Sequence, residues 1–132
     1  MYAMAGCGQG GGYARRPAFV VDDDVQMRNL LSEVAASVGL APLAFTSLTS
    51  ARDALHDQVP AVLVLDDDLP DGSGADFVRE LRADPRTRDA KVIVCTSAEE
   101  ARRREIAAVA PVIAKPFSVE DVERALREVA TG

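Results

Sequence analysis

Short apolar runs alternate with helical periodicities along most of the chain. The runs are rich in valine and show no alternation of apolar and polar positions. Such runs are typical of parallel strands that are buried on both faces of a sheet. The pattern therefore predicts five strands, over residues 18–21, 43–46, 61–65, 91–96 and 111–114.

The segments between these runs carry apolar residues at helical spacing. In the first of them Leu30, Leu31 and Val34 share one face, and Gly39 follows as a C-cap. In the last, Ser118 occupies the N-cap and Asp121 the N3 position. The predicted helical segments are residues 30–38, 51–58, 75–82, 98–109 and 119–129.

Five repeats of a strand followed by a helix predict the α/β class. A parallel sheet with helices on both faces follows from this alternation, and right-handed crossovers leave few topologies. The common solution is a doubly wound, flavodoxin-like (βα)5 domain with strand order 2-1-3-4-5. Its ligand site lies beyond the carboxyl ends of strands 1 and 3, where the order reverses.

Acidic triplets stand at those two strand ends. Residues 22–24 read DDD after the first strand, and residues 66–68 read DDD after the third. Exposed turn aspartates are common, but two runs at neighbouring strand ends favour a shared pocket. Converging carboxylates repel one another unless a cation binds among them. Oxygen ligands favour Mg²⁺ or Mn²⁺ there.

A hydroxyl and an ammonium group are predicted at the same sheet edge. Thr96 ends the fourth strand, and Lys115 follows the fifth. A lysine binds phosphate as a point charge, and a hydroxyl can donate to a phosphoryl oxygen. Together with the acidic triplets, these residues describe a metal-dependent site for a phosphoryl group.

Composition narrows the functional classes. The net charge of −6 argues against nucleic-acid binding, which needs a basic surface. The short run at residues 102–104, RRR, is interpreted as a solvated helix face. No apolar stretch reaches the roughly 18 residues of a membrane span. Two cysteines do not form a disulfide framework, which favours a reducing, cytoplasmic location. Residues 1–16 are glycine-rich and predict a disordered leader before a domain at 17–130.

Four motifs in this order resemble the receiver domains of two-component response regulators. They are VVDDD at residues 20–24, D-x-x-L-P followed by G-x-G at 66–74, the apolar run ending at Thr96, and KPF at 115–117. The resemblance covers about residues 17–130. It implies a phosphoacceptor domain that is switched by phosphorylation and is not a turnover enzyme.

The resemblance also implies a role for each acid. The phosphoacceptor is the aspartate four residues before Pro70, which is Asp66. Asp23 would ligate Mg²⁺ (or Mn²⁺) directly and Asp22 largely through water. The backbone carbonyl of Asp68 would complete the protein ligands, and its side chain is a candidate modulator of phosphoryl lifetime. Asp67 is interpreted as a solvated loop acid.

Further implied roles concern the switch and the partners. Thr96 matches the switch hydroxyl and Lys115 the phosphoryl-binding lysine, with a cis bond to Pro116. The donor would be a sensor histidine kinase or a histidine phosphotransfer protein. The receiver would act on a downstream protein target or on a C-terminal output domain missing from this chain.

Two departures from the family pattern stand next to each other. Val112 occupies the position of an aromatic residue that usually moves with the switch threonine. The connection before it, residues 109–111, reads VAP and is shortened. Both predict an altered output face with the preceding helix, 98–109, shifted or poorly ordered.

Two other functions remain open. A phosphatase of the haloacid dehalogenase class also uses D-x-D at a strand end, as at residues 66–68, but the residues that follow do not fit. The other alternative is a receiver-like module that binds partners without phosphorylation, because Val112 replaces the aromatic residue of the usual switch.

Overall fold

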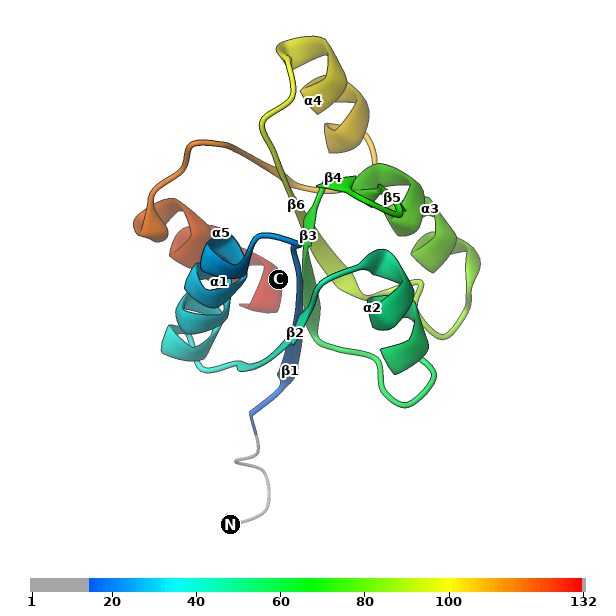
Figure 1. Ribbon diagram of the computed structural model, residues 1–132. Coiled ribbons are helices and arrows are strands. Elements are labelled where there is room, and N and C mark those ends of the chain that lie inside the picture. Colours follow the sequence, from blue (N-terminus) through cyan, green and yellow to red (C-terminus); the bar gives the residue numbers. More distant parts are fainter. Residues whose placement is uncertain (1–14, 132) are drawn as a thin grey trace.

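Five parallel strands form the sheet of this protein. The computed structural model describes residues 15–131 and orders the strands β2-β1-β3-β6-β7, which is 2-1-3-4-5 when the main-sheet strands alone are counted (Figure 1). The predicted fold class is therefore confirmed. The strands are β1 (Pro17–Val21), β2 (Ala41–Phe45), β3 (Val62–Asp66), β6 (Lys91–Thr96) and β7 (Val112–Ala114).

Helices cover both faces of the sheet. The helices α1 (Val25–Ser37) and α5 (Val119–Thr131) lie on one face. The other face carries α2 (Leu48–Ala54), α3 (Gly74–Ala83) and α4 (Glu100–Ala107). Successive strand residues serve opposite faces, since Val20 packs with α1 and α5 whereas Phe19 packs with α2 and α3. This double burial explains the unbroken apolar runs.

Local capping sets several helix ends. Asp24 caps α1 by accepting a hydrogen bond from Gln26 N at 2.9 Å. Gly39 has φ +91°, so the chain leaves α1 in the left-handed conformation that glycine adopts without strain. Ser118 and Asp121 bond each other's backbone N–H at 3.1 Å, as the predicted cap requires.

The buried thiol of Cys95 belongs to the core between the sheet and the pair α1 and α5. Burial raises its pKa to about 12, so the thiol stays protonated and inert at neutral pH.

The predicted leader, residues 1–16, lies mostly outside the described residues. Its last two residues are described and are attached to the domain. Arg15 Nη1 donates to Ala36 O at 3.3 Å, and Arg16 O accepts from Ala41 N at 2.9 Å. Hydrogen bonds to the domain are thus already made by Arg15 and Arg16, before the predicted domain start at Pro17. None of the described helices combines the length and apolar character that a bilayer crossing requires.

The helix predicted over residues 98–109 is regular but short. It spans Glu100–Ala107, and Ile106 is its buried side chain. The helix is thus formed but shorter than the predicted range, and it protrudes from the rest of the domain in Figure 1. Its polar sequence explains this placement, because one apolar anchor buries little surface.

The structure also contains a short hairpin, with two residues in each strand, that the sequence pattern did not predict. Strands β4 (Asp68–Leu69) and β5 (Gly72–Ser73) pair antiparallel just after β3. At its turn, Asp71 accepts hydrogen bonds from Leu48 N at 3.0 Å and from Thr49 N and Oγ1 at 2.8 and 2.7 Å. These donors lower the pKa of Asp71 to about 2, the Thr49 hydroxyl most. The hairpin thereby caps the start of α2.

Replacing Asp71 with alanine should lower the free energy of unfolding by about 0.5–2 kcal/mol, the usual cost of a lost helix cap. Because the folded pKa lies below the ordinary value of 3.8, Asp71 stabilises the fold above that pH and loses its effect as the pH falls towards 2. Urea unfolding between pH 7 and pH 2.5 measures both effects. An equal deficit at every pH would contradict the role given to the ionised carboxylate.

Candidate metal centre

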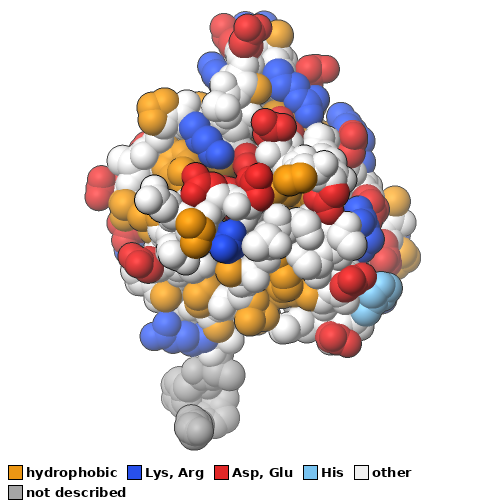
Figure 2. All heavy atoms as spheres, viewed as in Figure 1, with side chains coloured by type: hydrophobic (Ala, Val, Ile, Leu, Met, Phe, Trp, Pro, Cys, Tyr) orange, Lys and Arg blue, Asp and Glu red, His pale blue; other side chains and the backbone are white. Residues whose placement is uncertain are grey.

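Three carboxylates meet at the carboxyl end of the sheet. Strands β1 and β3 pair in parallel with Val21 opposite Leu65, so Asp22, which follows β1, and Asp66, the last residue of β3, stand side by side at this edge. One carboxylate oxygen each of Asp22, Asp23 and Asp66 lie within 4.8 Å of one another. In Figure 2 acidic side chains gather at this end of the sheet, with a basic side chain beside them. This spacing fits a single divalent cation.

Asp22 is the most buried of the three, with 1% of its surface exposed. Its Oδ1 accepts from Asp24 N at 2.9 Å, whereas its buried Oδ2 has no hydrogen-bond partner. Burial is the main cause that raises the pKa of Asp22, and the Asp66 carboxylate adds to it. An orphaned buried oxygen is costly unless a cation or water binds it. The residues present therefore fit a hydrated divalent ion.

Lys115 supplies the ammonium group of the pocket. Its Nζ lies 3.2 Å from Asp66 Oδ1, which also accepts from Asp68 N at 3.3 Å. Burial works against the charged lysine, but the attraction of Asp66 outweighs it and raises the pKa of Lys115. Lys115 N donates to Thr96 O at 2.8 Å, and the peptide bond to Pro116 is cis.

Thr96 ends β6 beside the acid pocket. The side chain is 3% exposed, and its Oγ1 accepts from Ala98 N at 3.0 Å. That contact leaves the hydroxyl proton free to donate to another group. Val112, in β7, pairs with Val94 of β6 and packs on the core that includes Ile106.

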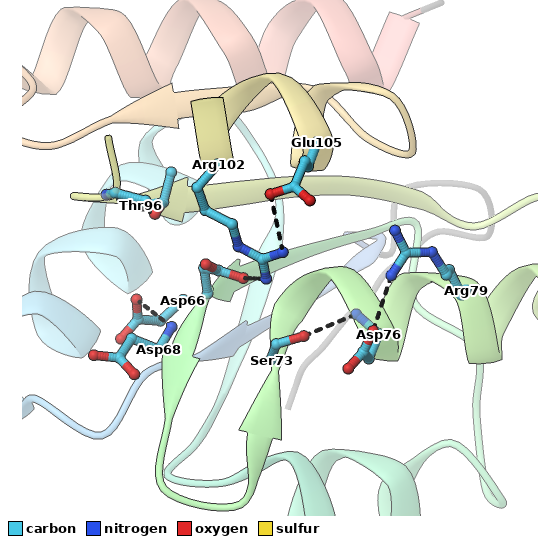
Figure 3. Close-up of polar contacts among 10 residues, drawn as sticks. Asp66, Asp68, Ser73, Asp76, Arg79, Thr96, Arg102 and Glu105 are labelled. Atoms are coloured by element: carbon cyan, nitrogen blue, oxygen red, sulfur yellow. Dashed lines mark hydrogen bonds and ion pairs between the residues drawn. The ribbon is translucent and has the colours of Figure 1, made fainter. Parts of the chain in front are cut away.

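Asp67 differs from its interpretation as a solvated acid. Only 10% of its side chain is exposed, and its Oδ1 lies 3.3 Å from Arg102 Nη2. Figure 3 labels Arg102 and marks this ion pair, and the one with Glu105 at 4.0 Å, by dashed lines. Arg102 is correspondingly not a wholly solvated residue. The sequence gives no signal for this pair, because 35 residues separate the partners and no spacing rule joins them.

Gly74 has a packing role that the motif alone did not reveal. A Cβ at this position would stand 3.1 Å from Asp66 O and 3.3 Å from Asp67 Cα. Helix α3 therefore begins in direct contact with the backbone of residues 66–68, the acidic segment. A side chain at Gly74 would press on this backbone, which would have to shift by a few tenths of an ångström.

The sequence comparisons agree with this geometry. Residues 18–127 match the sequence model of the response regulator receiver domain. The chain belongs to this family. Receiver domains are the phosphorylated modules of two-component signalling.

Two curated relatives define the match. The receiver is 32% identical to the phosphate regulon transcriptional regulatory protein PhoB of Escherichia coli, over 86% of this chain and 51% of PhoB. It is 30% identical to the probable chemotaxis protein CheY of Rhizobium etli, over 83% of this chain and 88% of that protein. The chain thus spans about half the length of PhoB.

A solved structure supports the same relationship. The beryllofluoride-activated NtrC4 receiver domain superposes with a TM-score of 0.79 at 25% identity, covering 87% of this chain and 96% of that one.

Replacing Asp22 with asparagine should stabilise the metal-free receiver. Its raised folded-state pKa means that ionisation opposes folding, an effect absent below pH 3.8 that grows as the pH rises to the folded-state pKa. We expect a gain on the order of 1 kcal/mol at neutral pH, the scale of an unsatisfied buried polar group. Urea unfolding in the presence of a chelator measures it.

Added Mg²⁺ should reverse this order, because mass action stabilises the form that binds the ion more tightly. A wild-type chain that is the more stable one without metal, or that gains nothing from Mg²⁺, would contradict this account of the pocket.

Proposed function

We propose that the receiver accepts a phosphoryl group on Asp66 in a reaction that depends on a divalent cation. The observation that carries the proposal is the contact between Asp66 and Lys115 within a cluster of three carboxylates. An acceptor must lie near a cation that offsets its charge and that of the incoming group.

The cation of this site would be Mg²⁺ or Mn²⁺. Asp23, which is exposed, and Asp66 would hold it directly, Asp22 largely through water, and the Asp68 carbonyl would complete the ligands. The unpartnered Oδ2 of Asp22 supports a water-bridged role. Bound there, the ion supplies charge compensation for the acceptor and the phosphoryl oxygens.

The transfer itself is a displacement at phosphorus. A carboxylate oxygen of Asp66 attacks, the new O–P bond forms, and the P–N bond of a phosphohistidine breaks with its electron pair returning to the imidazole. Lys115 binds a phosphoryl oxygen, and the free proton of Thr96 can reach another. Water later hydrolyses the acyl phosphate, and the exposed Asp68 side chain is placed to influence that step.

The donor would be a sensor histidine kinase or a histidine phosphotransfer protein in the cytoplasm. Phosphorylation would draw Thr96 inward and shift the surface formed by α4, β7 and α5. The receiver would then act on a downstream protein or on an output domain, as the name of PhoB, a transcriptional regulatory protein, suggests for that relative. Because Val112 occupies the position of the aromatic residue that is usual in the family, this surface lacks that aromatic side chain.

Phosphorylation by acetyl phosphate with Mg²⁺ tests the acceptor. Wild type should take up about one phosphoryl group, and Asp66→Asn should lose at least about 100-fold in rate, because its amide is no nucleophile. Asp76→Asn, a change at an aspartate exposed on α3, is the matched control and should label normally.

Labelling of Asp66→Asn at the wild-type rate would overturn the assignment. Sustained turnover of p-nitrophenyl phosphate would instead favour a phosphatase. Binding of partners that ignores the phosphoryl group would favour a constitutive binding module.

A further inference from the structure

Helix α4 is fastened to the domain at two points. Ile106 is its buried side chain, and Arg102 forms its ion pair with Asp67. The neighbouring arginines bond locally, since Arg103 Nη1 donates to Ala98 O and Arg104 pairs with Glu100 one turn away. Among the described polar contacts, the pair of Arg102 and Asp67 is therefore the one that joins α4 to the acidic segment (Figure 3).

Both backbone groups of Asp67, its N–H and its carbonyl, are hydrogen-bonded. Its N–H donates to Cys95 O at 3.0 Å, and its carbonyl accepts from Gly74 N at 3.2 Å. These bonds fix it between β6 and the start of α3, with its side chain nearly buried. A carboxylate that turned to solvent would lose its contact with Arg102. It presents a fixed negative charge one residue from Asp66, and Arg102 offsets it.

We propose that Arg102 is a positioning residue that couples the charge of the acceptor pocket to the placement of α4. The inference rests on the proposed function of Asp66 and adds a residue to it. Conversion of the Asp66 carboxylate to an acyl phosphate adds about one negative charge beside Asp67. Partly buried charges are screened less than exposed ones, so with Mg²⁺ bound before and after the transfer this increment strengthens the field that acts on Arg102.

The direction of the coupling follows from the sign of the charge. Loading of the pocket strengthens the attraction for Arg102 and holds α4 more tightly to the acidic segment. By reciprocity, the arginine that is drawn in also favours the loaded pocket by the same factor. Lys115 contacts Asp66 directly and stays with the phosphoryl group.

Beryllofluoride with Mg²⁺ is the probe, because it imitates the phosphoryl group without hydrolysis. Arg102→Gln should weaken its binding about three- to tenfold, the scale of coupling between neighbouring charged groups. Arg104→Gln is the matched control on the same helix and should bind as wild type does. Arg102→Lys, which keeps the charge but not the fork-shaped donor, should fall between them.

Hydrogen exchange of residues 100–107 gives the second measurement. In the wild type and in Arg104→Gln, exchange in α4 should slow when beryllofluoride binds. In Arg102→Gln it should not respond. A purely structural role would change exchange in the free protein and leave the response to the probe intact.

A double-mutant cycle tests the route through Asp67. In the Asp67→Asn background, Arg102→Gln should change beryllofluoride binding by less than about twofold, because the negative charge that holds Arg102 beside the pocket has already been removed. An undiminished effect there would show that Arg102 acts without Asp67 and would overturn the proposed route.

The result that overturns the coupling itself is wild-type affinity in Arg102→Gln together with a wild-type response of α4. That outcome leaves the acceptor role of Asp66 intact. If the wild-type chain fails to bind beryllofluoride, the proposed function fails, and this inference fails with it.

Discussion

The carboxylates at the end of β1 and β3 repel one another, and the rest of the site is built around that repulsion. Parallel pairing of the two strands brings Asp22 and Asp66 together at the carboxyl edge of the sheet. Burial removes the water that would screen them, so each local cation has a large effect. Lys115 provides one compensating charge, and the unpartnered Oδ2 of Asp22 shows that the compensation is incomplete. A divalent cation would complete it.

The same constraint organises the neighbouring loops. Two elements that follow β3 and β6 contact the acidic residues: the start of α3 at Gly74, and α4 through Arg102. Each attachment fixes backbone or charge near Asp66. The two elements differ in how firmly they are held, because α3 has five buried residues whereas α4 has one, Ile106. Under the proposed function, a change of charge at Asp66 would therefore act more on the placement of α4 than on that of α3.

The fold was predictable because its main signals are local. Apolar runs buried on both faces identify parallel strands, and their order places Asp22, Asp66, Thr96 and Lys115 at one edge. The caps at Gly39 and Ser118 were also visible. Contacts made by single side chains across the fold were not predictable, because nothing local in the sequence joins their partners. Asp71 on the start of α2 and Asp67 on Arg102 are of this kind.

A crystal structure of the wild-type chain with Mg²⁺ and beryllofluoride tests the central claim most directly. The account predicts beryllium bonded to a carboxylate oxygen of Asp66, with Mg²⁺ held by Asp23 and Asp66 and with Lys115 Nζ within hydrogen-bond distance of a fluorine. Beryllofluoride bonded to Asp23 or Asp67, or a metal bound away from the three clustered carboxylates, would contradict it.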